Sequence, residues 1–213
     1  MWGKVTQAVY EQSAGALIAI DGKTLRGACE RGERRSMIHM VSAWASQHRL
    51  VLGQCKVEEK SNEITAIPEL LKVLELEGAL VSIDAMGCQT AIAKTIIEGQ
   101  GDYVLALKGN QGDLYTDVEQ LFDHACRTEF QGIEHDSYQI IEKGHSRIEH
   151  RTYWTMGQTD YLLGAELWAG LKSIGCVESR RRSPGESGTS QRRYYLLSLE
   201  SDAQRFADAV CSH

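Results

Sequence analysis

Apolar residues gather along the chain in short runs that alternate with amphipathic stretches, a pattern typical of a sheet with helices packed against it. Short apolar or alternating runs predict five strands in the first half of the chain, at residues 16–20, 38–44, 50–57, 80–83 and 103–107. The first run ends at Asp21-Gly22, where a turn is expected. A polar break at residues 46–49 indicates a hairpin between the second and third strands, so the sheet is predicted to be mixed.

Apolar positions at helical spacing predict three helices, at residues 66–76, 89–98 and 114–125. For the first of these we expect Thr65 as the cap, Pro68 in the first turn and Gly78 just past the end. The fold class predicted from this order of elements is α/β.

The pattern changes from Gly132 onward, where strands are predicted with little helix between them. They fall at residues 138–141, 151–154 and 194–197, and a polar loop is expected at residues 180–191. A last helix is predicted at residues 203–210, near the end of the chain and without a cap. Its Phe206 and Val210 are expected to leave apolar surface uncovered, which predicts marginal stability. The chain is accordingly divided into four segments, at residues 1–15, 16–131, 132–200 and 201–213.

The composition is that of an ordinary globular chain. Of the 213 residues 42% are hydrophobic and only 2 are proline, which is unlike a disordered protein. No apolar run approaches the roughly 18 residues of a membrane span, and the N-terminus lacks the apolar core of a signal peptide. We therefore expect no membrane contact and a cytoplasmic location. The cysteines form no C-x-x-C pair, which disfavours a zinc site or a disulfide scaffold.

Two segments are basic although the chain as a whole carries a formal net charge of −6. Residues 22–36 and residues 171–195 each hold more Lys and Arg than Asp and Glu. The net charge argues against a protein that coats nucleic acid by bulk charge. Each basic segment is compatible with a solvated loop or with a contact to a phosphate backbone.

Two aspartates, Asp21 and Asp84, each follow an apolar strand. In a sheet covered by helices, such residues lie at the carboxyl ends of strands, where sites form. Two carboxylates brought together there repel each other unless a cation lies between them. Hard oxygen ligands suit Mg²⁺ or Mn²⁺, which complete their shells with water and substrate phosphates. Asp is also an ordinary turn former and strand-end cap, so the spacing leaves both roles open.

Other polar residues border the same predicted strand ends. Lys23 and Lys108 can each bind a phosphate as a point charge, and Asn110 and Gln111 can hydrogen-bond sugar or phosphate oxygens. A solvated loop accounts equally well for each of them taken singly. Glu149 lies near two histidines whose spacing does not fit a zinc motif. A charged hairpin face explains that cluster better, with Glu149 as a candidate third carboxylate.

Two longer motifs surround the aspartates. Residues 18–27 read IAIDGKTLRG and residues 81–89 read VSIDAMGCQ. They resemble the first and second acidic motifs of bacterial insertion-sequence transposases of the H-repeat-associated type, which belong to the DDE class. The resemblance continues through residues 57–64, 67–71 and 102–111 and covers nearly the whole chain from Ile18 onward.

This resemblance implies a ribonuclease-H-like mixed sheet with flanking helices and a β-rich insertion before the last catalytic helix. In that family three carboxylates hold two divalent cations, Mg²⁺ or Mn²⁺, for metal-dependent cleavage and strand transfer of DNA. Asp21 and Asp84 match the first two carboxylates. The need to hold two DNA ends implies a homodimer. The residues expected to contact double-stranded DNA are Lys23, Arg26, Lys108, Asn110 and Gln111.

The chain departs from the family pattern at both ends. The third carboxylate is expected on a helix with the motif Arg-Ser-His-Trp-x-Ile-Glu-Asn. In this sequence Cys211 stands at the position of the arginine and the sequence ends at His213, so the Trp and the Glu are absent from it. The segment before the first acidic motif is also short. We therefore expect a truncated, inactive transposase. Two other functions remain open: a non-catalytic DNA-binding remnant that occupies transposon ends, and a phosphodiesterase of the same fold with two acidic ligands.

Overall fold

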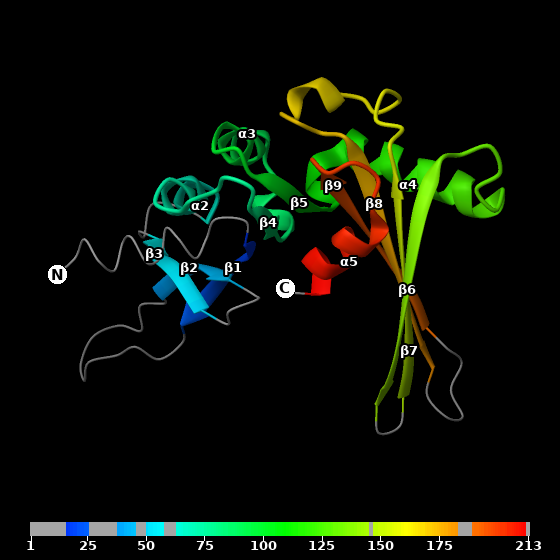
Figure 1. The fold of residues 1–213 in the computed structure, drawn as a ribbon, viewed down its shortest axis with the longest axis horizontal. Coiled ribbons are helices and arrows are strands. Elements are labelled where there is room, and N and C mark those ends of the chain that lie inside the picture. The colour runs from blue at the N-terminus through cyan, green and yellow to red at the C-terminus, as the bar shows by residue number, and fades with distance from the viewer. Residues whose placement is uncertain are drawn as a thin grey trace. The chain divides into compact units, whose positions relative to one another are not determined.

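The computed structural model describes residues 16–25, 38–45, 50–57, 63–144, 147–182 and 189–211, and it is a mixed α/β fold (Figure 1). The chain divides into two compact units, Met1–Tyr103 with Ser212–His213 and Val104–Cys211. The four sequence segments with ends at residues 15, 131 and 200 remain predictions. None of the helices in these described stretches is both long enough and apolar enough to cross a membrane.

The first unit contains a mixed sheet with the strand order β3-β2-β1-β4. β1 pairs antiparallel with β2 and parallel with β4, and β2 pairs antiparallel with β3. The predicted mixed sheet and the pairing of β2 with β3 are confirmed, and the turn at residues 46–49 lies outside the described residues. The strands are β1 (Leu17–Leu25), β2 (Ile38–Ala45), β3 (Leu50–Val57) and β4 (Leu80–Ile83).

Strand β1 does not stop at Asp21-Gly22, so the turn predicted there is wrong. The strand runs on to Leu25 because β2 continues to pair with it, with Asp21 opposite Ser42 and Gly22 opposite Val41. Pairing with a neighbouring strand holds this segment extended and overrides the turn preference of an Asp-Gly pair, which is a local tendency only.

Helix α2 (Glu63–Leu71) begins and ends earlier than the predicted 66–76. Thr65 therefore lies within the helix and does not cap it. The helix ends where the backbone tightens, because the N–H of Leu74 donates to the carbonyl of Leu71, three residues back. Helix α3 (Thr90–Glu98) agrees with the prediction to within a residue.

The second unit is an antiparallel sheet with the strand order β5-β9-β8-β7-β6. Strand β5 (Asp102–Leu107) starts at the end of the first unit. The other strands are β6 (His135–Gly144), β7 (Arg147–Met156), β8 (Ser173–Arg182) and β9 (Thr189–Leu197). β6, β7 and β9 enclose the strands predicted for this region but extend beyond them.

Strand β8 has no counterpart in the prediction, and the loop expected at residues 180–191 is wrong at both ends. Arg180 and Arg181 belong to β8, and Thr189 and Ser190 belong to β9. The polar residues are extended because they pair across the two strands, Arg180 with Ser190 and Arg181 with Thr189. Residues 183–188 lie outside the described residues. Cross-strand pairing thus stabilises the extended conformation of a stretch that has no apolar pattern of its own.

Two helices cover opposite faces of this second sheet. Phe122 of α4 (Gly112–Arg127) stacks on Tyr194, while Phe206 of α5 (Ala203–Cys211) meets Tyr195 edge to face. Tyr194 and Tyr195 are consecutive residues of β9, and side chains alternate between the faces of a strand. Short 3₁₀ helices, η2 (Gly109–Gln111) and η3 (Ala165–Leu167), lie in the connections.

The expectation that α5 leaves apolar surface uncovered is wrong for Phe206, which is completely buried. Its ring contacts Tyr153 and Tyr195 with centroid distances of 5.9 and 5.1 Å. The start of α5 is held by Asp202, whose Oδ1 accepts a hydrogen bond of 2.9 Å from the N–H of Arg205. The helix therefore closes the core of the second unit instead of exposing it.

We predict that Gly175→Ala destabilises the second unit by about 1–3 kcal/mol. A Cβ at this position would lie 2.7 Å from Cζ of Phe206 and 3.0 Å from Cδ1 of Leu197, and both side chains are buried. Urea unfolding followed by circular dichroism measures the loss. Gly109→Ala is the matched control, because its added Cβ meets nothing within 4 Å. Equal stability of the two variants would contradict the close packing of α5 on β8.

Candidate functional site

The two predicted carboxylates lie side by side at the level where β4 ends, while β1 continues past Asp21. Strands β1 and β4 run parallel with Ile20 opposite Ile83, so Asp21 and Asp84 are the next residues on neighbouring strands. Neighbouring strands are about 4.8 Å apart. Both aspartates are exposed. The structure therefore brings together two residues that the sequence places at the ends of separate apolar runs.

Asp84 is held in place by the backbone that follows it. It caps the short 3₁₀ helix η1 (Ala85–Gly87), and its Oδ1 accepts hydrogen bonds from the N–H groups of Met86 and Gly87 at 3.0 and 3.4 Å. Among the described residues no hydrogen bond reaches its Oδ2. One oxygen thus fixes the carboxylate and leaves the other for a ligand.

Gly87 makes this tight cap sterically feasible. A Cβ there would lie 2.3 Å from Cγ2 of Ile83 and 3.0 Å from Cδ1 of Ile67, closer than real Cβ atoms approach. Gly87 was not among the predicted site residues, although it falls within the motif that carries Asp84. Glycine at a close backbone approach is the signal that could have found it.

Asp21 continues into a row of polar side chains across the sheet. It lies opposite Ser42 on β2, and Ser42 lies opposite Gln54 on β3. Paired residues of antiparallel strands point to the same face. Nε2 of Gln54 donates to Oγ of Ser42 over 3.2 Å. Ser42 and Gln54 were missed by sequence reasoning, because only the register of the strands aligns them with the aspartates.

Asp21 and Asp84 fit a divalent cation by the chemistry of their side chains. Adjacent carboxylates repel each other, and hard oxygen ligands are those that Mg²⁺ and Mn²⁺ prefer. Over the stretches of chain that the structure describes, no group of three or more His, Cys, Asp and Glu side chains could hold a metal ion.

Glu149 lies on β7 in the second unit and is engaged with arginines. Its side chain is only 6% exposed, and its Oε1 lies 2.9 Å from Nε of Arg151 and 3.3 Å from Nε of Arg181. Burial alone would raise the pKa of Glu149, but the hydrogen bonds and charges of the two arginines hold that pKa below its usual value. The carboxylate is thus part of an ion-pair network.

The five predicted DNA contacts are distributed over the two units. Lys23 belongs to β1, and Arg26 lies outside the described residues. Lys108 is exposed directly after β5, and Asn110 and Gln111 follow it in η2. The last three therefore follow one another directly after a strand, and their contact with DNA stays a prediction.

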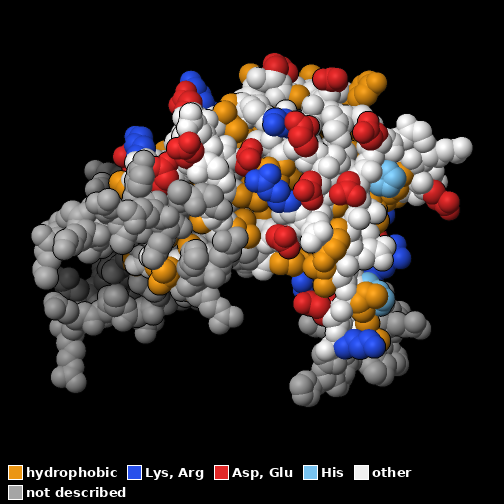
Figure 2. Space-filling view, in the orientation of Figure 1, with side chains coloured by type: hydrophobic (Ala, Val, Ile, Leu, Met, Phe, Trp, Pro, Cys, Tyr) orange, Lys and Arg blue, Asp and Glu red, His pale blue; other side chains and the backbone are white. Residues whose placement is uncertain are grey.

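The basic segment at residues 171–195 forms much of β8 and β9, where acidic residues partly neutralise it. Glu178 is buried between Arg180, at 2.7 Å, and Arg192, at 3.3 Å, and Arg192 also binds Asp123 at 2.8 Å. Figure 2 shows acidic side chains gathered over the region of α4. It also shows Lys, Arg and His side chains along β6 and β7, toward the bottom of the view. The other basic segment, at residues 22–36, lies largely outside the described residues.

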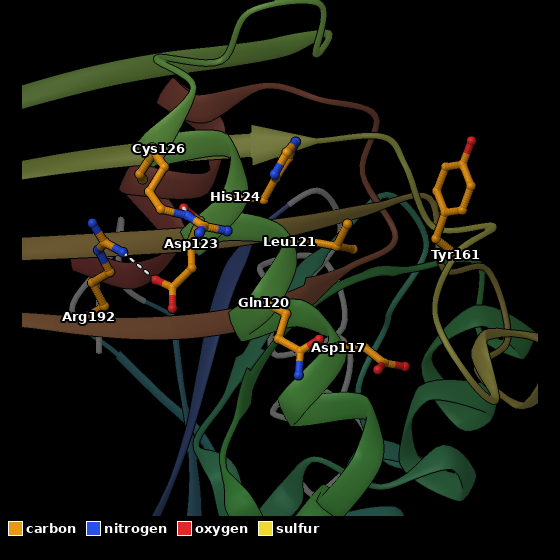
Figure 3. Close-up of a pocket in the computed structure, with 9 residues that line it drawn as sticks. Asp117, Gln120, Leu121, Asp123, His124, Cys126, Tyr161 and Arg192 are labelled. Carbon is orange, nitrogen blue, oxygen red and sulfur yellow. Dashed lines mark hydrogen bonds and ion pairs between the residues drawn. The ribbon is translucent and has the colours of Figure 1, made fainter.

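A hollow of about 990 Å³ lies along the exposed side of α4 (Figure 3). The ion pair between Asp123 and Arg192 closes one part of it, and Tyr161 stands on a separate loop. No predicted site residue among those that the structure describes lines it. The lining residues are Asp117, Gln120, Leu121, Asp123, His124, Cys126, Arg127, Tyr161 and Arg192.

Comparison with known proteins finds similarity to transposases. A family model described as the transposase DDE domain matches residues 12–213. "Putative transposase YncI" of Escherichia coli O157:H7 is 43% identical over 211 residues, which is 97% of this chain and 53% of that protein. "H repeat-associated putative transposase YhhI" of Escherichia coli K12 is 43% identical over 201 residues, or 92% and 52%. The chain spans about half the length of these curated relatives.

Among solved structures, the piggyBac transposase synaptic complex with hairpin DNA is similar over 92% of this chain and 36% of that chain. The TM-score is 0.44 and the sequence identity is 11%, a likeness too distant to establish a shared fold.

We predict that Glu149→Gln lowers the free energy of unfolding at pH 7 by about 1–3 kcal/mol, because it removes the buried carboxylate charge that two partly exposed arginines bind. The pKa of Glu149 is lowered by folding, so its contribution is present above the unfolded value of about 4.3 and is lost as the pH falls through the lower folded value. The difference between wild type and variant should therefore shrink below about pH 4. Denaturant unfolding at several pH values measures it.

The control for this prediction is Glu69→Gln, which removes an exposed ion pair with Lys72. Exposed pairs contribute little, so its effect should stay within about 0.5 kcal/mol. Equal effects of the two variants would show that Glu149 is no more important to the fold than a surface glutamate.

Proposed function

The chain belongs to the transposase DDE domain family, and on that basis we propose that it carries the catalytic carboxylates of a DNA transposase, for cleavage and strand transfer in insertion-sequence transposition. The observation that supports this most directly is the parallel register of β1 and β4, which sets Asp21 beside Asp84. Adjacent carboxylates suit phosphoryl transfer, because a bound cation can neutralise charge on the reacting phosphate.

The first unit is proposed to be ribonuclease-H-like. Its strand order β3-β2-β1-β4, with three antiparallel strands and a fourth that is parallel to the first, supports this assignment. The antiparallel β6–β9 region of the second unit is then the β-rich insertion expected from the sequence.

Asp21 and Asp84 would hold Mg²⁺ or Mn²⁺. The cation, when bound, supplies positive charge that stabilises the entering and leaving oxygens of a phosphodiester. The protein's own contribution is to keep the two carboxylates adjacent and oriented. The backbone N–H groups of Met86 and Gly87 do this for Asp84 by binding its Oδ1.

The proposed substrate is double-stranded DNA, at transposon ends and at the target. Lys23, Arg26 and Lys108 would neutralise backbone phosphates, and Asn110 and Gln111 would donate hydrogen bonds to sugar or phosphate oxygens. Two DNA ends must be held at once, so the active form is proposed to be a homodimer. A cytoplasmic location is proposed as well, because the activity needs access to DNA.

We propose that the 213-residue chain by itself does not transfer DNA strands. No group of three potential ligands is found within the described residues, and Glu149, the candidate third carboxylate, is occupied by Arg151 and Arg181. The second candidate function is a non-catalytic DNA-binding protein that occupies transposon ends, and the engagement of Glu149 supports only its lack of catalysis.

We predict weak Mn²⁺ binding to the purified chain, with a dissociation constant of about 0.1–1 mM, since only two charged ligands are provided. Asp21→Asn and Asp84→Asn should each weaken it at least tenfold, because each removes one of the two anionic ligands. Mn²⁺ electron paramagnetic resonance counts the free ion directly. Asp160→Asn, an exposed aspartate of the second unit, is the control and should bind as wild type does. Unchanged binding by Asp84→Asn would refute the metal site.

We also predict that the chain binds duplex DNA with an affinity that falls steeply with salt but neither nicks nor joins it in Mg²⁺. Lys108→Ala should reduce the slope of log K against log[salt] by about 1, as expected for one lost phosphate contact. Fluorescence anisotropy at several salt concentrations measures the slope. Lys94→Ala, which removes an exposed lysine paired with Glu98, is the control and should leave the slope unchanged.

Product analysis on a supercoiled plasmid separates the candidate functions. Joined products that depend on Mg²⁺ and are lost in Asp84→Asn would overturn the proposed inactivity. Nicking without joining would instead indicate a phosphodiesterase of the same fold.

A further inference from the structure

Two large apolar side chains are exposed beside each other on the hairpin that β6 and β7 form. Ile141 is 56% exposed and Ile148 is 41% exposed. Ile148 pairs with Lys143, two residues beyond Ile141, so the two isoleucines are diagonal neighbours on one face of the sheet. Figure 1 shows the hairpin running on beyond α4 and α5. A single exposed apolar residue is ordinary, but an adjacent pair calls for an explanation.

The same face carries basic side chains around the isoleucines. His150 pairs with Ile141 on β6 and with Arg180 on β8, and Lys143 pairs with Ile148. Paired residues point to the same face, so these five side chains share it, and together they are called the ribbon face. Lys143 and His150 are exposed, and the side chain of Arg180 is 68% exposed. Figure 2 shows hydrophobic, basic and His side chains together along this part of β6 and β7.

The ribbon face carries no exposed carboxylate among the described residues of β6 to β9. By register, Glu178 is the one acidic residue of these strands on the same side of the sheet, and it is buried. Glu142 and Glu149 pair with each other on the opposite side, where both bind Arg151. Arg180 binds Glu178 through Nη2, and the other N–H groups of a guanidinium can bind a second anion. The exposed charges of this face therefore suit an anionic partner.

The spacing of the cations suits a groove of duplex DNA. Lys143 and Arg180 lie on β6 and β8, the two strands that flank β7. Neighbouring strands are about 4.8 Å apart, so these two are about 10 Å apart across the sheet. The major groove of B-DNA is about 12 Å wide, and strands of a sheet can lie in it. Ile148 and His150 of β7 would then face the groove between the two cations.

We propose that the ribbon face is a further DNA-binding surface, which lies in the major groove of duplex DNA. Lys143 and Arg180 bind backbone phosphates on the two sides of the groove, and Ile141 and Ile148 contact the methyl groups of thymines. The proposal rests on the proposed function, because it takes DNA as the substrate. It adds a surface of the second unit to the five DNA contacts proposed above.

The first test measures the affinity of the full chain for a labelled DNA duplex of mixed sequence, by fluorescence anisotropy at several salt concentrations. Ile141→Ser and Ile148→Ser should each weaken binding about three- to tenfold, because apolar surface is no longer removed from water. Their slope of log K against log[salt] should stay unchanged, since no charge is lost. Lys143→Ala should instead reduce the slope by about 1.

The second test uses a duplex in which uracil replaces thymine, which removes the methyl groups and keeps the charge and the base pairing. The wild type should bind this duplex about two- to fivefold more weakly than the thymine duplex, because the apolar contact is lost. The variant with both isoleucines replaced by serine should bind the two duplexes equally. Equal binding of the two duplexes by the wild type would overturn the contact in the major groove.

Leu163→Ser and Lys172→Ala are the matched controls. Leu163 is 67% exposed and lies between β7 and β8, and Lys172 is an exposed lysine that forms an ion pair with Glu200. Both residues belong to the second unit but not to the ribbon face, so both variants should bind DNA as the wild type does. Circular dichroism checks that every variant is folded.

The outcomes distinguish this proposal from the proposed function. If the wild type binds DNA and the variants of Ile141, Ile148 and Lys143 bind as it does, the ribbon face is overturned and the DNA substrate stands. If the wild type binds no duplex, the proposed substrate fails and the ribbon face with it. A changed oligomeric state of Ile141→Ser with unchanged DNA binding would identify an interface between two copies instead, and would also overturn the proposal.

Discussion

The parallel pairing of β1 with β4 is the constraint on which the candidate site depends. With Ile20 opposite Ile83, the residues that follow are Asp21 and Asp84. A shift of one residue would turn one aspartate toward the opposite face of the sheet and bury its charge. The apolar side chains next to the aspartates are buried, so such a shift is strongly disfavoured; these are Ile18, Ala19, Ile20, Leu80, Val81 and Ile83. The core packing therefore fixes the distance between the two carboxylates.

The acidic pair is held in position by neighbouring residues that carry no charge. Gly87 allows the backbone to close on Ile83, and that closure aims the N–H groups of Met86 and Gly87 at Asp84. Ser42 and Gln54 extend the polar row from Asp21 across the hairpin. Orientation by backbone donors does not depend on a second side chain, which makes it a rigid way to hold a carboxylate for a ligand.

The second unit has to accommodate buried carboxylates. Its sheet buries two glutamates, and each is placed between arginines: Glu149 between Arg151 and Arg181, and Glu178 between Arg180 and Arg192. Paired charges of this kind make an otherwise polar ribbon of strands tolerable in a folded state. The same ion pairs engage the carboxylate of Glu149, which is therefore not free to bind a metal ion. In this unit the four arginines are thus engaged in ion pairs that stabilise the fold.

The sequence by itself determined the strong apolar elements and the family. β4, α3 and the buried face of α4 are close to their predictions, because each is a local apolar pattern. The motifs around Asp21 and Asp84 indicated the transposase family, which the family match confirms. Only the tertiary structure decided the length of β1, the existence of β8, the burial of Phe206 and the ion pairs of Glu149. Each of these depends on a partner distant in sequence, whose register and packing no local pattern encodes.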